Sequence, residues 1–234
     1  MVRREKTDRA NVILQDVILK LDVDAVGIAR LAEWKGTKLE ETALRLLPEA
    51  RSVLVFAKEI SPEILDLSTH SRTVGAPSMN DLLNAEANHS NSQLNKAAFD
   101  FAKACRNLGL KALTLPAAGC PLDNRFLDAV FSYKHAGQAA GLGKMGWHSL
   151  LITPDFGPRV RMAVCLTQAE LEPTKTEFAL QCESCGICLD NCPAGALAVP
   201  ESDQQYAINK FACCTYRSAS GGCSECMRVC PEGR

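Results

Sequence analysis

The chain has 234 residues, of which 47% are hydrophobic and 23% are charged, and its formal net charge is −1. This composition is typical of a globular protein, and the near-neutral charge gives no general attraction to nucleic acid or to an anionic membrane. No apolar run approaches the roughly 18–20 residues that a membrane span requires. Polar residues follow Arg3 and Arg4 where an export signal needs an apolar stretch, so we expect a cytoplasmic protein without membrane contact.

Apolar spacing predicts alternating helices and strands along the first 172 residues. Helices are expected over 11–21, 38–47, 94–108 and 132–140, and strands over 25–31, 52–57, 111–115, 149–153 and 159–167. The stretch 61–80, rich in Ser, Thr, Pro and Gly, is expected to be a loop. Cys105 and Cys165 fall on apolar positions of their elements and are expected in the core.

This alternation predicts an α/β or α+β domain over residues 1–172. The polar stretch 170–177 is a plausible linker, and a second domain is expected over residues 173–234.

Nine of the twelve cysteines lie between Cys182 and Cys230, in two similar halves. The first half spaces three cysteines by two residues and ends in Cys192-Pro193. The second half has only Cys223 and Cys226 at this spacing before Cys230-Pro231, and its first cysteine, Cys213 or Cys214, is displaced upstream. Three cysteines at this spacing bind three irons of one cubane, and the fourth, before proline, ligates the other cluster. The spacing therefore predicts a ferredoxin-like domain with two 4Fe–4S clusters. One cluster would be held by Cys182, Cys185, Cys188 and Cys230, the other by Cys192, Cys223, Cys226 and either Cys213 or Cys214.

A pair of structural zinc sites is the alternative interpretation of these cysteines. Zinc ribbons use paired cysteines that are separated by longer loops, and they do not require a triple cysteine run with a trailing Cys-Pro. The radical-SAM motif does not match either, because it needs a three-residue gap before a two-residue gap. The pattern favours clusters.

Residues Gly141, Gly143 and Gly146 match the dinucleotide pattern G-x-G-x-x-G. That fingerprint needs a strand before it and a helix after it, so that pyrophosphate meets a helix N-terminus. Here the expected order is reversed, and the motif does not predict NAD or FAD. The glycines indicate tight turns or a flat ligand that lies close to the backbone.

Three segments together resemble the superfamily of epoxyqueuosine reductases and reductive dehalogenases. They are Ser132-Tyr133-Lys134-His135-Ala136, the glycine-rich segment 141–161 and the crossed cysteine repeat, and the likeness covers about residues 85–231. The resemblance implies a nitroreductase-like core that holds cobalamin and a ferredoxin-like domain that delivers electrons to cobalt. Cys213-Cys214-Thr215-Tyr216 is similar to the "CISY" segment of epoxyqueuosine reductases, which implies Cys213 as the ligand.

The resemblance also implies a corrinoid-binding site. Its predicted residues are Lys134, His135, Gly141, Gly143, Gly146, Trp147, His148, Leu151, Pro158 and Arg159. Small residues let backbone approach a flat ring, and the basic side chains are donors for the corrin amides and phosphate. Without the resemblance, the two histidines would be ordinary half-buried residues and Arg159 a charge at a strand edge.

The chain departs from the pattern of epoxyqueuosine reductases at the residue that donates the proton. Epoxyqueuosine reductases carry an aspartate in an Asp-Ser/Thr-Gly-Pro segment, and the comparable stretch 116–121 has no acid at that position. Asp123, Cys120 and Tyr133 are nearby candidates for the catalytic acid. Tyr133 would suit the pattern of the reductive dehalogenases, in which a tyrosine donates the proton.

Two functions follow as hypotheses. The first is a cytoplasmic corrinoid-dependent reductase that passes electrons from an external donor, of ferredoxin or flavodoxin type, through two clusters to cobalt and reduces a small molecule. The alternative is an iron–sulfur electron-transfer or accessory protein without a corrinoid, with a flavin as a candidate cofactor. Because the chain ends at Arg234, we do not expect the C-terminal repeats that epoxyqueuosine reductases use on tRNA, nor a tRNA substrate.

Overall fold

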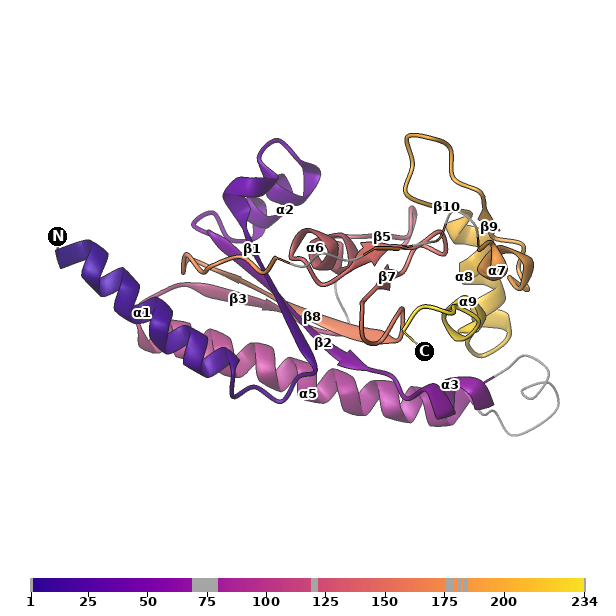
Figure 1. The fold of residues 1–234 in the computed structure, drawn as a ribbon, viewed down its shortest axis with the longest axis horizontal. Helices are drawn as coiled ribbons and strands as arrows, with labels where there is room; N and C mark the ends of the chain where they lie inside the picture. The colour runs from indigo at the N-terminus through magenta and orange to yellow at the C-terminus, as the bar shows by residue number, and fades with distance from the viewer. Residues whose placement is uncertain are drawn as a thin grey trace. The chain divides into compact units, whose positions relative to one another are not determined.

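The computed structural model in Figure 1 describes residues 2–68, 80–118, 122–175, 179–180, 182 and 185–233. The chain forms two compact units, each assembled from separate segments. The first unit comprises Met1–Lys58, Asn91–Leu142 and Arg161–Thr176, and the second comprises Glu59–Ser90, Gly143–Val160 and Glu177–Arg234. The domain boundary predicted at residue 172 stays a prediction; the second unit also takes in two earlier segments.

A four-stranded sheet organises the first unit, in the order β1-β2-β8-β3. Its strands are β1 (Ala25–Arg30), β2 (Ser52–Glu59), β8 (Val160–Thr167) and β3 (Ala112–Leu115). β1 pairs antiparallel with β2, and β3 pairs antiparallel with β8. The first six residues of β2 are all buried, as expected for an apolar run inside a sheet covered on both faces. All four strands were predicted from the sequence.

Two helices cover one face of this sheet (Figure 1). They are α1 (Val2–Ile18) and the part of α5 (Asn80–Asn107) from Asn91 onwards. Phe101 of α5 packs against Phe56 of β2 with ring centroids 6.1 Å apart. Cys105 and Cys165 are fully buried in the same core, which confirms their predicted packing role. Both helices begin well before the predicted residues.

The opposite face of β1 contacts the chain that follows α6 (Tyr133–Ala139). A side chain at Gly27 would lie 2.6 Å from Leu142 and 2.7 Å from the carbonyl oxygen of Ala140. The other elements of this unit are η1 (Leu31–Trp34), α2 (Lys38–Leu46) and the hairpin of β4 (Leu122–Asp123) with β5 (Asp128–Ala129). α2 and α6 match the predicted helices to within a residue.

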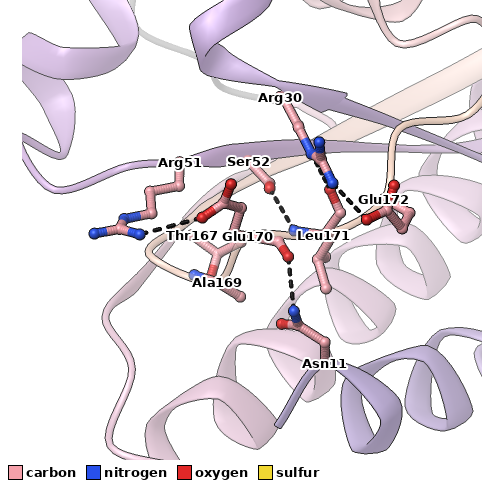
Figure 2. Close-up of polar contacts among 9 residues, drawn as sticks. All are labelled: Asn11, Arg30, Arg51, Ser52, Thr167, Ala169, Glu170, Leu171 and Glu172. Carbon is pink, nitrogen blue, oxygen red and sulfur yellow. Dashed lines mark hydrogen bonds and ion pairs between the residues drawn. The ribbon is translucent and has the colours of Figure 1, made fainter. Parts of the chain in front are cut away.

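The chain that leaves β8 is fastened to the first unit by side-chain hydrogen bonds (Figure 2). Ser52 Oγ accepts the backbone N–H of the buried Leu171 at 2.9 Å, and Asn11 donates to the carbonyl oxygen of Glu170 at 2.8 Å. The start of the predicted linker 170–177 is therefore held against the sheet, because its backbone groups find partners there. Residues 176–178 lie outside the described residues.

The second unit consists of short elements. They are α3 (Pro62–Leu67), the hairpin of β6 (Lys144–Met145) with β7 (Leu151–Ile152), α7 (Ile187–Asp190), the pair β9 (Leu197–Ala198) and β10 (Ala207–Ile208), α8 (Lys210–Ala219) and α9 (Glu225–Arg228). α3 corrects the expected loop over 61–80: Pro62 opens a helix there because its fixed φ suits the first helical position. Residues 69–79 lie outside the described residues. None of the helices in the described residues has the length and apolarity that crossing a membrane requires.

Candidate functional site

The two halves of the cysteine repeat fold alike in the second unit. Each half contains a four-residue helix, α7 or α9, and each helix carries one cysteine, Cys188 or Cys226. A Cys-Pro follows each helix, at Cys192 and at Cys230. Since proline cannot continue a helix, the chain turns away at these points, as a crossed ligand arrangement requires.

The structure brings together the first cysteine group, which comprises Cys182, Cys185, Cys188 and Cys230. The pKa of Cys188 is raised to about 11, first by burial and then by the nearby thiolates of Cys182 and Cys185. The pKa of Cys230 is likewise raised to about 11 by burial and by the charges of Cys182 and Cys188. These four thiols are the ones that the spacing assigns to one cluster. Their role as ligands stays a prediction.

The first cysteine group surrounds a cavity of about 350 Å³. Besides the four cysteines, its lining residues are Trp147, His148, Gly186, Pro231, Glu232 and Gly233. The thiolates of a cubane bind four different irons, so they stand further apart than the ligands of one ion. Space between converging thiols is what such a cluster requires.

The second cysteine group comprises Cys192, Cys213, Cys223 and Cys226, and these thiols are also neighbours. The pKa of Cys226 is raised to about 12, first by burial and then by Cys223, Cys213, Cys188 and Cys192. Because Cys188 belongs to the first group, the two groups adjoin. Cys213 is half-buried, and the thiolates of Cys223 and Cys192 raise its pKa further after burial. Cys214 is exposed.

The raised pKa values of Cys188, Cys226 and Cys230 favour the protonated thiol in these three residues until a cation binds. A coordinating metal deprotonates a thiol outright, so iron would convert the mutual repulsion of the thiolates into attraction. Within the described residues, no group of three or more His, Cys, Asp or Glu side chains is placed to hold a metal ion. Ligands of one ion must converge on one point, whereas the ligands of a cubane are spread over its corners.

Backbone N–H groups point at several of these sulfurs. The N–H of Trp147 hydrogen-bonds Cys182, and the N–H of Glu232 hydrogen-bonds Cys230; each lowers the pKa of its cysteine against the larger effect of burial. The N–H of Ala196 donates to Cys192 Sγ at 3.3 Å. Sequence reasoning missed Glu232 and Ala196, because a backbone donor leaves no signal in the residue type.

Local packing among the described residues explains why the segment 141–146 has glycine at three positions. Gly141 has φ +75° and ends α6: its N–H bonds the carbonyl of Gln138, and the next N–H bonds Gly137, as in a Schellman motif. A side chain at Gly143 would overlap the backbone of Ile152 across the hairpin, and one at Gly146 would lie 2.6 Å from the Ile152 side chain. The order in this segment is helix, glycines, hairpin, which confirms the prediction that these glycines do not join a strand to a following helix as a dinucleotide fingerprint does.

The predicted corrinoid residues are divided between the units. Lys134, His135 and Gly141 belong to the first unit, and Gly143, Gly146, Trp147, His148, Leu151, Pro158 and Arg159 to the second. His135 Nδ1 lies 2.6 Å from Ser132 Oγ, and burial followed by the charge of Lys134 lowers its pKa. His148 is buried, and its Nδ1 accepts the N–H of Leu150 at 3.1 Å.

Arg159 is the most unusual of these residues, because its guanidinium is buried. Its side chain is 5% exposed and donates from Nη2 to the carbonyl oxygen of Gly233 at 2.6 Å. Among the described residues, its Nε and Nη1 atoms have no hydrogen-bond partner. Buried donors of this kind fit an anionic group, such as the phosphate of a bound cofactor. If Arg159 were only a charge at a strand edge, its buried Nε and Nη1 donors would have no explanation.

The candidates for the catalytic acid are not arranged to donate a proton in the described residues. Arg125 bonds the carboxylate of Asp123 and lowers its pKa, which keeps that acid ionised. Asp123 lines a cavity of about 810 Å³ in the first unit, with residues of α2. The hydroxyl of Tyr133 donates to the carbonyl oxygen of Pro116 at 2.8 Å. Cys120 lies outside the described residues.

Similar proteins share a reductase chemistry. No family model matches the sequence. A tetrachloroethene reductive dehalogenase from Desulfitobacterium hafniense is 31% identical over 200 residues, which are 77% of this chain and 32% of that protein. An epoxyqueuosine reductase from Bacillus cereus is 32% identical over 108 residues, which are 42% of this chain and 28% of that protein. The chain thus spans about a third or less of the length of these curated relatives.

Solved structures of the same two kinds share the mixed α/β fold. A reductive dehalogenase described as performing B12-dependent dehalogenation superposes with a TM-score of 0.72 at 21% identity, over 94% of this chain and 31% of that chain. The epoxyqueuosine reductase of Bacillus subtilis superposes with a TM-score of 0.59 at 18% identity, over 97% of this chain and 66% of that chain. At these identities the likeness concerns the fold.

Proposed function

We propose that this homologue of the reductive dehalogenases and the epoxyqueuosine reductases is an iron–sulfur oxidoreductase that carries two 4Fe–4S clusters and works as a corrinoid-dependent reductase. In this proposal the first unit belongs to a nitroreductase-like core, and the cysteine-rich end forms a ferredoxin-like domain. The observation that carries it is the gathering of eight cysteines into two groups of four, one of them around a cavity.

The residues of the chain fit the clusters. The first cysteine group holds one cluster and the second holds the other, with Cys213 as the displaced ligand. Cubane clusters transfer single electrons, and their potentials respond to hydrogen bonds at sulfur, which Glu232 and Ala196 supply here. An external donor of ferredoxin or flavodoxin type is the expected source of the electrons.

Cobalamin is proposed on the strength of the relatives and of one buried side chain. The relatives include a B12-dependent dehalogenase, and the buried Nε and Nη1 donors of Arg159 suit the phosphate of a corrinoid. When bound, the cofactor supplies a cobalt centre that is a strong reductant and nucleophile, while the protein binds and orients it. The packing causes found for Gly141, Gly143 and Gly146 mean that these glycines no longer support a corrinoid.

The proposed substrate is a small molecule. The dehalogenase relatives act on tetrachloroethene, a compact apolar compound, and the net charge of −1 provides no general attraction for nucleic acid.

An electron-transfer protein without a corrinoid is the second candidate. The observation that favours it is the state of the predicted acids: Asp123 is held ionised by Arg125, and the Tyr133 hydroxyl is engaged by Pro116. A reductase needs a group that delivers a proton to the substrate. A two-cluster protein that only relays electrons does not.

Anaerobic reconstitution tests both candidates. We expect about eight irons and about eight sulfides per chain. Cobalamin titrated into this protein should shift its visible spectrum to the base-off form, and the same titration into a two-cluster ferredoxin is the control. Intact clusters without a shift would leave the electron-transfer protein, and bound zinc or far less iron would remove both candidates.

A further inference from the structure

The two halves of the cysteine repeat end in the same four-residue pattern, Cys-Pro-x-Gly, at residues 192–195 and 230–233. Gly195 and Gly233 both have left-handed backbone, with φ of +53° and +72°. Within the described residues, no atom lies within 4 Å of a Cβ placed on Gly195, whereas a Cβ on Gly233 would overlap the backbone of Gly157. We call each Cys-Pro-x-Gly segment a corner. The corner at residues 192–195 is open at its glycine, and the corner at residues 230–233 is packed.

The partner of Gly233 is a tight turn in the same unit. Thr153 and Gly157 exchange backbone hydrogen bonds of 2.8 and 3.0 Å, and Thr153 Oγ1 also donates to the Gly157 carbonyl at 3.0 Å. A Cβ on Gly157 would overlap the carbonyl oxygen of Glu232. The two glycines thus allow the turn and the corner to meet backbone against backbone, and a methyl group on either would push them apart.

Arg159 also holds the Cys-Pro-x-Gly segment at residues 230–233. Its Nη2 donates to the Gly233 carbonyl at 2.6 Å and lies 3.4 Å from Glu59 Oε1. Its backbone carbonyl accepts the N–H of Ile60 at 2.8 Å. A charged hydrogen bond in a buried position is strong, and removing one partner is costly.

The held corner contains the donor to a cluster sulfur. Glu232 lies between Cys230 and Gly233, and its backbone N–H hydrogen-bonds the Cys230 thiolate. Fixing Gly233 therefore fixes the direction of this N–H. Hydrogen bonds to cluster sulfurs stabilise the reduced, more negative cluster and so raise its reduction potential.

We propose that Gly157, Gly233 and Arg159 are positioning residues for the cluster held by the first cysteine group. They keep the Glu232 amide on the Cys230 sulfur and thereby raise the reduction potential of that one cluster. The inference rests on the proposed function, because it presupposes that the first cysteine group binds a cluster.

The repeat supplies a matched pair of variants for the test, Gly233→Ala and Gly195→Ala. Both add one methyl group at a left-handed position, but only the first meets a neighbour. Iron, sulfide and both reduction potentials would be measured on the anaerobically reconstituted full chain, by EPR during titration with dithionite. A Cys230→Ala variant identifies which signal belongs to the first cysteine group.

We expect Gly233→Ala to lower the potential of the first cluster, or to remove about half of the iron, and to leave the second cluster unchanged. Gly195→Ala should leave the first cluster unchanged. Arg159→Lys is the second test, since lysine keeps the charge but lacks the guanidinium, whose Nη2 contacts both Glu59 and Gly233. The iron content of this variant should match that of the wild type, while the reduction potential of the first cluster falls.

Equal effects of Gly233→Ala and Gly195→Ala on the first cluster would overturn the inference. An unchanged reduction potential of the first cluster in Arg159→Lys would also overturn the inference, and this variant decides the question even if Gly233→Ala does not fold. A wild-type chain that binds two clusters while its variants fail these expectations contradicts only the inference. A wild-type chain without clusters contradicts the proposed function as well.

Discussion

At the scale of single residues, the adjacent cysteines at 213 and 214 show how one position separates a predicted ligand from a surface thiol. Both lie on α8, where consecutive side chains point in directions about 100° apart. Cys213 is half-buried, and after burial the charges of Cys223 and Cys192 raise its pKa further. Cys214 is exposed. Only a thiol that reaches the other members of its group can complete a cluster.

The first prediction concerns these two residues. Cys213→Ala should lower the iron content of the reconstituted protein by about half, because one of the two clusters loses a ligand. Cys214→Ala should leave it unchanged and serves as the matched control. Iron and sulfide analysis with EPR of the reduced protein measures both. The reverse result would make Cys214 the ligand.

The second prediction concerns the pH dependence of stability at His135. Burial and Lys134 lower its pKa in the folded state from 6.5, so the unfolded chain binds the proton more tightly. The favourable contribution of the neutral ring is complete above about pH 6.5 and is lost as the pH falls towards the folded pKa. Wild-type stability should therefore drop more steeply below this pH than that of His135→Gln, in denaturant unfolding at a series of pH values. Parallel curves for the two proteins would contradict it.

At the scale of elements, the hairpin of β6 and β7 depends on a close approach between its arms. Gly143 faces the backbone of Ile152, and Gly146 faces its side chain. Both glycines are buried, so the space that a side chain would need is already occupied by the chain itself. This packing operates with or without a cofactor.

The third prediction separates packing from cofactor binding at this hairpin. Gly143→Ala should lower the free energy of unfolding by about 3 kcal/mol, because the added methyl group meets backbone that cannot rotate away. Lys144→Ala, on an exposed neighbour, should change it by less than about 0.5 kcal/mol. Denaturant unfolding without added cobalamin measures both. If Gly143→Ala were as stable as the wild type, the glycine would serve a ligand instead.

At the scale of the whole molecule, the first unit and the cysteine-rich residues 185–233 differ in the size of their apolar cores. The first unit has a continuous apolar core between its sheet and its helices. In the described residues 185–233, the buried apolar side chains are Cys188, Ala196 and Cys230, and two of these are predicted ligands. Three small buried side chains cannot offset the entropy of ordering residues 185–233, so we expect bound metal to contribute to the stability of this segment.

The fourth prediction follows from this difference. Removing iron with a chelator under anaerobic conditions should increase amide hydrogen exchange across residues 185–233, because the cysteine loops lose their cross-links. Exchange in β2 and in α5 from Asn91 onwards should stay slow. Mass spectrometry of peptides from the two regions compares them within one sample. Equal loosening of both regions would show that the units unfold together.

Several features could be predicted from the sequence because they depend on local pattern. The strands β1, β2, β3 and β8 and the helices α2 and α6 follow from apolar spacing, and the burial of Cys105 follows from its place on an apolar stripe. Contacts between distant segments could not be predicted this way. The pairing of β2 with β8 and the hydrogen bond between Leu171 and Ser52 join residues about a hundred or more positions apart.

The two halves of the cysteine repeat, and the residues that they contribute, can be recognised without a structure because ligand spacing is a local property of the chain. The reason why Gly143 and Gly233 are glycines, and the group that the side chain of Arg159 binds, became visible in the folded chain. In each case the answer depends on backbone atoms brought close by folding, and a carbonyl oxygen or an amide N–H is the same for every residue type.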